Sequence, residues 1–179
     1  KFKNISGFMQ AKAEDFLEVQ GIGKKLCEKI ITYRTKIDPF SEIEKANKQK
    51  VSIITLFDED YPERLKEIYD PPPVLYVKGN KSVLRDKAIA IVGSRKASTY
   101  GRRVAVNFAK ELALMNINIV SGMARGIDSF AHKGAIEAGG PTTAVFGCGI
   151  DIVYPPENEA LMQEIIEYGC VVSSFPFGT

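Results

Sequence analysis

Three glycine-bearing turns, each directly after a short apolar segment, carry the residue types that could do chemistry in this chain. The turns begin at Gly93, Ser121 and Gly147, and two of them contain an arginine, Arg95 or Arg125. Backbone N–H groups at a helix start, with an arginine beside them, suit a phosphate, because the planar guanidinium forms paired hydrogen bonds with its oxygens. We therefore expect an anionic ligand at these turns.

The elements that position the turns follow from the pattern of apolar residues. Short apolar runs alternate with amphipathic stretches in the order β-α-β-α-β-α-β, which predicts an α/β domain with a Rossmann-like parallel sheet. The predicted strands are 87–92, 117–120, 142–146 and 171–174, and the predicted helices are 99–115, 127–138 and 157–168. We expect helices on both faces of the sheet. The three turns then meet at the carboxyl ends of the strands, where open α/β sheets bind ligands.

The first part of the chain has a different character, because residues 1–46 read as helical. Gly21-Ile22-Gly23 interrupts two amphipathic segments and is followed by Lys24-Lys25. This resembles a helix-hairpin-helix motif, in which a glycine turn brings N–H groups close to a DNA phosphate; the alternative is a plain turn between packed helices. We expect a SAM-like helical module at 1–48, with a lysine-rich linker, and the α/β domain at 49–179. Shorter strands at 51–57 and 74–77, and a helix at 61–68, open the second domain.

The net charge of +2 conceals an uneven distribution. Residues 85–133 carry nine Lys/Arg against three Asp/Glu, whereas residues 134–179 carry six acidic residues and no basic ones. A basic block that includes two of the three turns can attract a polyanion, although it is also compatible with a solvated helix face. The three cysteines and one histidine fit neither a disulfide framework nor a His-rich metal site, which favours a reducing cytoplasm.

The turn at Gly93 departs from the common nucleotide-binding fingerprints. It reads Gly-Ser-Arg-Lys-Ala-Ser, so Arg95 stands where the dinucleotide fingerprint has its second glycine, and no Gly-Lys-Ser/Thr P-loop is present. We therefore expect neither NAD nor ATP, and no other cofactor. We expect Arg95 to bind a phosphate; the alternative is an ion pair with a carboxylate at the sheet edge.

The other two turns leave several roles open. The helix start at Gly126 can hold an anion, while Arg125 either adds charge or pairs with Asp128, whose role we expect to be mainly structural. His132 is expected to be packed within its helix. In the third loop, Gly147, Tyr154 and Asn158 could line the DNA pocket. Tyr154 either stacks on a base or fixes the loop, and Asn158 could also cap the next helix. Phe175 and Phe177 either wall the same pocket or pack elsewhere.

No catalytic constellation is visible. There is no Ser-His-Asp arrangement and no paired carboxylate site, and nothing in the sequence places a base beside Cys148. We therefore expect binding rather than catalysis, and no metal.

Four motifs in order resemble the DNA-processing protein A family (DprA/Smf). They are Ile91-Val92-Gly93-Ser94-Arg95; Ser121-Gly122-Met123-Ala124-Arg125-Gly126-Ile127-Asp128 with Ala131-His132; Gly147-Cys148-Gly149-Ile150-Asp151 with Tyr154-Pro155 and Glu157-Asn158; and Phe175-Pro176-Phe177-Gly178-Thr179. The resemblance implies an extended Rossmann domain and a cytoplasmic, non-enzymatic single-stranded DNA-binding protein of natural transformation. Such a protein protects incoming strands, helps load the RecA recombinase and forms a homodimer. Carried over by position, Gly93, Ser94 and Arg95 would hold a DNA phosphate, with Ser121, Gly122, Arg125 and Gly126 beside them.

The chain departs from the family pattern in three respects. Pro156 stands where many members have a lysine, and Ser174 stands where an acidic residue is frequent. The family's sheet continues past Gly178-Thr179, so we expect a C-terminally truncated domain that binds and dimerises weakly. The rival reading is a nucleoside monophosphate phosphoribohydrolase of the lysine-decarboxylase-like (LOG) type, but its Pro-Gly-Gly-x-Gly-Thr loop is altered here, with Phe177 in place of a glycine. A dinucleotide-dependent oxidoreductase is disfavoured by Arg95.

Overall fold

The computed structural model describes residues 2, 5–36 and 38–179, which form two compact units, 1–41 and 42–179. The boundary lies several residues before the predicted one at 48/49. The reason is helix α4 (Pro39–Lys48), whose Ala46 is buried in one core cluster with Val51 and Tyr76 of the second unit. The lysine-rich stretch that we expected to be a linker is therefore largely the end of a helix that packs on the sheet unit.

The first unit contains α1 (Ile5–Gln10), α2 (Ala13–Leu17) and α3 (Lys24–Lys36) around a small core. Phe16 is fully buried in it with Cys27. Arg34 donates to the carbonyl oxygens of Phe8 and Ala11 at 2.9 and 2.8 Å, which ties α3 to the end of α1. The predicted glycine turn separates α2 from α3, and Gly21 adopts a positive φ of 91° there. Contact of this turn with DNA, through Gly21, Gly23, Lys24 and Lys25, stays a prediction.

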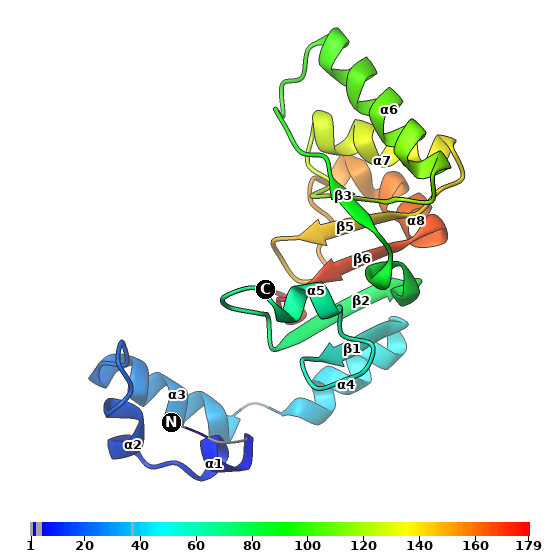
Figure 1. Ribbon diagram of the computed structural model, residues 1–179. Coiled ribbons are helices and arrows are strands. Elements are labelled where there is room, and N and C mark those ends of the chain that lie inside the picture. The colour runs from blue at the N-terminus through cyan, green and yellow to red at the C-terminus, as the bar shows by residue number, and fades with distance from the viewer. Residues whose placement is uncertain (1, 3–4, 37) are drawn as a thin grey trace. The chain divides into compact units, whose positions relative to one another are not determined.

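The second unit is built on a six-stranded mixed sheet in the described residues (Figure 1). Its strands are β1 (Val51–Thr55), β2 (Val74–Gly79), β3 (Ala88–Ala90), β4 (Asn118–Ser121), β5 (Thr142–Phe146) and β6 (Cys170–Ser173). The order is β1-β2-β6-β5-β4-β3. Strands β3 to β6 are parallel, as predicted, whereas β2 pairs antiparallel with both β6 and β1. The carboxyl ends of the parallel strands therefore share one edge.

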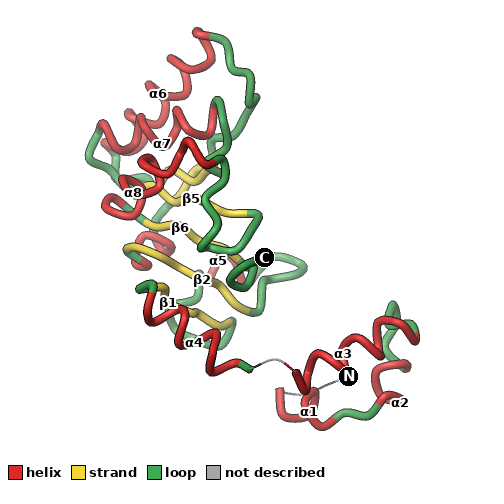
Figure 2. The backbone as a smooth tube through the Cα atoms, turned by 180° about the vertical axis from the view of Figure 1, so that it is seen from behind, coloured by secondary structure: helices red, strands yellow, loops and turns green. Residues whose placement is uncertain are grey.

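Helices α6 (Thr99–Leu114), α7 (Ile127–Glu137) and α8 (Glu159–Tyr168) lie on the same face of this sheet, as Figures 1 and 2 show. Our prediction that they cover both faces was wrong. Strands β3, β4, β5 and β6 add in a single direction, so successive right-handed crossovers return on one side. Close packing of α6 on α7 depends on Gly134, where an added Cβ would lie 2.3 Å from the carbonyl oxygen of Val106.

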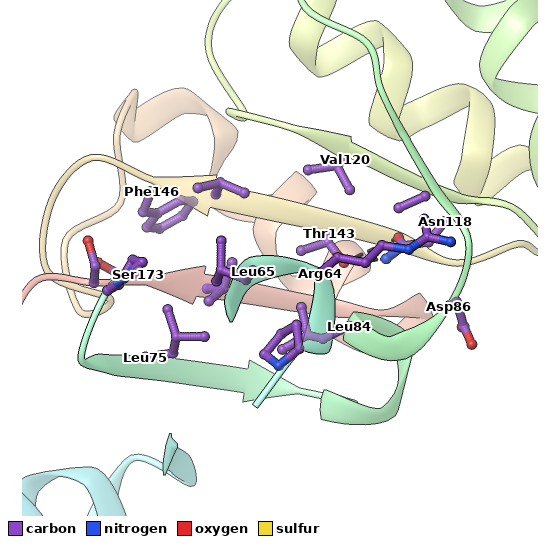
Figure 3. Close-up of a pocket in the computed structure, with 16 residues that line it drawn as sticks. Arg64, Leu65, Leu75, Leu84, Asp86, Asn118, Val120, Thr143, Phe146 and Ser173 are labelled. Atoms are coloured by element: carbon purple, nitrogen blue, oxygen red, sulfur yellow. Dashed lines mark hydrogen bonds between the residues drawn. The ribbon is translucent and has the colours of Figure 1, made fainter. Parts of the chain in front are cut away.

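The opposite face is covered only in part, by α5 (Glu63–Lys66) and the 3-10 helix η1 (Lys81–Arg85). Alternate residues of β6 enter separate cores: Val171 packs on the α8 side, and Cys170 and Val172 pack on the side of α5 and η1. A mostly apolar cavity of about 360 Å³ remains there, lined among others by Leu65 and Val120 (Figure 3). No helix in the described ranges is both long and apolar enough to cross a membrane.

Candidate functional site

The turn after β3 is seated on the start of α7. The N–H of Gly93 donates to Asp128 Oδ1 at 3.3 Å, and the N–H of Ile127 donates to the carbonyl oxygen of Ser94 at 3.2 Å. Gly126, with φ of 81°, lies so close that an added Cβ would come within 2.1 Å of the same Ser94 oxygen. The turn is thus fixed by its backbone, and the Arg95 side chain remains exposed.

Asp128 joins the first two turns. Its side chain is only 7% exposed, and while Oδ1 accepts from Gly93, Oδ2 accepts from the N–H of Gly122 at 3.1 Å. A carboxylate at a helix N-terminus is also favoured by the helix dipole. The mainly structural role predicted for Asp128 is confirmed. The N–H groups of Gly93 and Gly122, which we predicted to bind a phosphate, therefore already donate to Asp128 in the free protein.

Ser121 is also engaged inside the protein. Its side chain is 2% exposed, and its hydroxyl donates to the carbonyl oxygen of Ile91 at 2.6 Å. This bond links β4 to the residue that follows β3. The hydroxyl therefore helps to hold the first turn in place, and the predicted direct phosphate contact of Ser121 stays a prediction.

The third loop is tied to the second turn by Asn158. Its amide nitrogen donates to the carbonyl oxygen of Met123 at 2.8 Å and to Ser129 Oγ at 2.9 Å. The expectation that Asn158 caps α8 with its side chain was wrong, because it lies at the end of the 3-10 helix η2 (Pro156–Asn158) with φ and ψ of −92° and 14°. That backbone is not the extended conformation of a capping residue. Asn158 instead holds the third loop against the turn after β4 and the start of α7.

A cavity of about 310 Å³ opens where the three turns meet. Its lining is Arg95, Gly122, Ala124, Phe146, Gly147, Cys148, Ile152 and Tyr154. Four of these, Arg95, Gly122, Gly147 and Tyr154, were predicted site residues. Sequence reasoning did not assign Ala124, Phe146, Cys148 and Ile152 to the site; the position of Phe146, as the last residue of a predicted strand, was the available signal.

The two site arginines differ in their electrostatic state. Arg95 forms no ion pair with any described residue. Arg125 pairs with Glu157, with Nε to Oε1 at 2.5 Å and Nη2 to Oε2 at 3.0 Å, and not with Asp128, the partner that the sequence left open. These hydrogen bonds from Arg125 lower the pKa of Glu157 below its usual range. Among the described residues that line the cavity, only Arg95 therefore presents an unneutralised guanidinium to it.

The two phenylalanines of the fourth motif lie outside the lining of this cavity. Phe177 packs edge-to-face on Tyr76, with ring centroids 5.5 Å apart, and its N–H donates to Glu42 Oε1 at 3.0 Å. Phe175 is 39% exposed. Of the two roles left open for Phe177, the structure shows packing. Stacking by Phe175 stays a prediction.

Cys148 lines the cavity, but burial, and secondarily Asp151, raise the pKa of its thiol. A thiol with a raised pKa stays protonated near neutral pH and is a poor nucleophile. The single histidine of the chain, His132, is fully buried and bonded to Thr142. No group of three or more metal-ligating side chains occurs among the described residues.

Comparisons with known proteins relate the chain to a single family. Residues 52–179 match the family model for DNA recombination-mediator protein A. The chain is 38% identical over 182 residues to the protein Smf of Synechocystis, covering 99% of this chain and 46% of that protein. It is 37% identical over 129 residues to DNA processing protein DprA of Bacillus subtilis, covering 72% and 43%. The chain thus spans about half the length of these relatives.

Two solved structures are also similar. DNA processing protein A from Streptococcus pneumoniae matches with a TM-score of 0.77 and 34% identity, over 94% of this chain and 58% of that one. The protein of the same name from Helicobacter pylori, described for its single-stranded DNA binding mode, matches with a TM-score of 0.64 and 30% identity, over 72% and 57%. The sheet unit that carries the three turns is the part that the family model matches. The chain therefore belongs to the DNA recombination-mediator protein A family, whose members include Smf and DprA.

Proposed function

We propose that this chain binds single-stranded DNA in the cavity at the carboxyl edge of its sheet. The observation that carries the proposal is the unpaired Arg95 guanidinium on a cavity that also exposes the Tyr154 ring. A guanidinium supplies a charge-assisted contact to a backbone phosphate, and an aromatic ring supplies a stacking surface for an unpaired base. The basic block around Arg95 adds long-range attraction for a polyanion.

The biological role that we propose follows from the relatives and goes beyond the geometry. As a DNA-processing protein, the chain would act without catalysis in the cytoplasm during natural transformation. It would protect incoming single strands and help to load the RecA recombinase, as a homodimer. The ssDNA binding mode of the Helicobacter pylori relative supports the ligand class.

A titration with three ligands tests the proposed function. We expect a single-stranded oligonucleotide to bind more tightly than a duplex of the same sequence or a mononucleotide, because only unpaired bases can stack on Tyr154 and only a polymer supplies several phosphates. The affinity for the single strand should fall with salt. Tightest binding of the mononucleotide, with release of its ribose phosphate, would instead favour a nucleotide hydrolase.

A further inference from the structure

The carboxylate of Glu157 lies at the rim of the cavity, where it is paired with an arginine. Arg125, in the turn after β4, and Glu157, in η2, form a two-pronged pair across 32 residues of sequence. Neither is in the cavity lining itself, but Ala124, which precedes Arg125, is, and so is Tyr154 of the loop that leads to η2. Glu157 thus presents two oxygens to Arg125 at the mouth of the site, as a phosphate would.

This pair can be exchanged for another anion. The side chains of Arg125 and Glu157 are 54% and 52% exposed, and such exposed ion pairs contribute little net stability. A DNA phosphate carries a full negative charge and binds a guanidinium in the same forked geometry. A phosphate that takes the place of the Glu157 carboxylate can therefore form the same paired hydrogen bonds with Arg125.

The backbone around the pair is held by other contacts. The Asn158 side chain bonds Met123 and Ser129, which fixes η2 against the turn after β4 without involving Arg125. Asp128 holds the same turn from the other side through Gly122. Release of the Arg125 side chain from Glu157 therefore needs a change of side-chain conformation only.

We propose that Glu157 is an internal competitor that occupies Arg125 until a DNA phosphate displaces it. This inference rests on the proposed function. In the free protein, Arg95 attracts the strand and Arg125 is neutralised. A strand that also reaches the rim gains a second arginine contact at the cost of the Arg125–Glu157 pair. Glu157 thereby reduces the gain in affinity from the second contact, whereas a ligand that engages Arg95 alone leaves the Arg125–Glu157 pair intact.

The test is the single-stranded DNA affinity of Glu157→Gln across several salt concentrations. We expect binding about two- to tenfold tighter than wild type, because no carboxylate competes for Arg125. The log–log salt slope should stay unchanged, because the same phosphates are contacted in both complexes. Glu159→Gln is the matched control, because it removes the same charge from an exposed neighbour that makes no contact with Arg125. The change of DNA affinity in Glu159→Gln therefore measures the effect of removing one negative charge without releasing Arg125.

The Arg125→Ala variant assigns any gain to the right side chain. Alone it should weaken binding and make the log–log salt slope shallower by about 0.7, because the second phosphate contact is lost, and added to Glu157→Gln it should abolish the gain. If wild type binds single-stranded DNA but Glu157→Gln binds no better than Glu159→Gln, or binds more weakly, the competitor role is wrong while the proposed function stands. If neither wild type nor any variant binds single-stranded DNA, the proposed function fails, and this inference fails with it.

Discussion

Replacement of Gly126 by alanine is expected to destabilise the sheet unit by about 2–5 kcal/mol and to abolish tight DNA binding. Gly126 has a φ of 81° and a ψ of −132°, a conformation that residues with a Cβ adopt only under strain. The new Cβ would lie 2.1 Å from the carbonyl oxygen of Ser94 and 2.7 Å from that of Arg95, both backbone atoms. The turn that presents Arg95 must therefore shift, which adds an overpacking cost. Urea denaturation and DNA titration measure the two effects.

Gly139→Ala is the matched control for this result. Gly139 also has a positive φ, of 68°, but an added Cβ would meet no atom within 4 Å. We expect it to cost about 1–2 kcal/mol, the conformational strain alone, and to leave DNA affinity unchanged. If Gly126→Ala and Gly139→Ala lost the same stability and the same DNA affinity, the close contact of Gly126 with the turn after β3 would not be what holds that turn in place.

Folding stability is expected to fall by about 1.6 kcal/mol in total as the pH drops from 6.5 to 5, with a slope that approaches about 1.4 kcal/mol per pH unit toward pH 5. His132 is fully buried, and burial lowers its pKa from 6.5 to about 3. Thr142 donates its hydroxyl to the carbonyl oxygen of Ile119, so its oxygen accepts from Nδ1–H of His132, and Nε2 has no partner among the described residues. Below pH 6.5 the unfolded chain takes up a proton that the folded chain refuses, so stability is lost as the pH falls.

The slope of stability against pH can be assigned to one residue, because His132 is the only histidine of the chain. Carboxylates with lowered pKa values, such as Asp58 and Asp60, contribute only at more acidic pH. Urea denaturation at pH 7, 6 and 5 should therefore show a slope in the wild type that is absent in His132→Leu. A flat profile in the wild type would show that the imidazole is not buried in its neutral form.

Much of the sheet unit could be predicted from the sequence because its signals are local. Strand β5 was predicted at its observed residues, and the spans of α6 and α7 each agree to within a residue, since apolar periodicity and glycine breaks mark them directly. The meeting of the turns at one edge followed from the rule that parallel strands share a carboxyl edge. Arg95, Gly122, Gly147 and Tyr154 were brought together as this rule requires.

The features that could not be predicted depend on contacts distant in sequence. The pairing of Arg125 with Glu157 requires knowing that η2 returns to the turn after β4, and the same return gives Asn158 its two bonds. The position of the helices on one face depends on the order in which strands join the sheet, which apolar pattern alone does not encode. The placement of α4 depends on burial of the small side chain of Ala46, which carries little hydrophobic signal.

The central claim, that Arg95 holds a phosphate of single-stranded DNA, is tested most directly by Arg95→Ala in a salt titration. The account predicts about tenfold weaker binding and a log–log salt slope shallower by about 0.7, the loss of one charge-assisted phosphate contact. Arg103→Ala, which removes an exposed arginine of α6 from the same basic block, should change both quantities little. Unchanged DNA affinity and salt slope in Arg95→Ala, or an equal loss of affinity in Arg103→Ala, would contradict the claim that Arg95 holds a DNA phosphate.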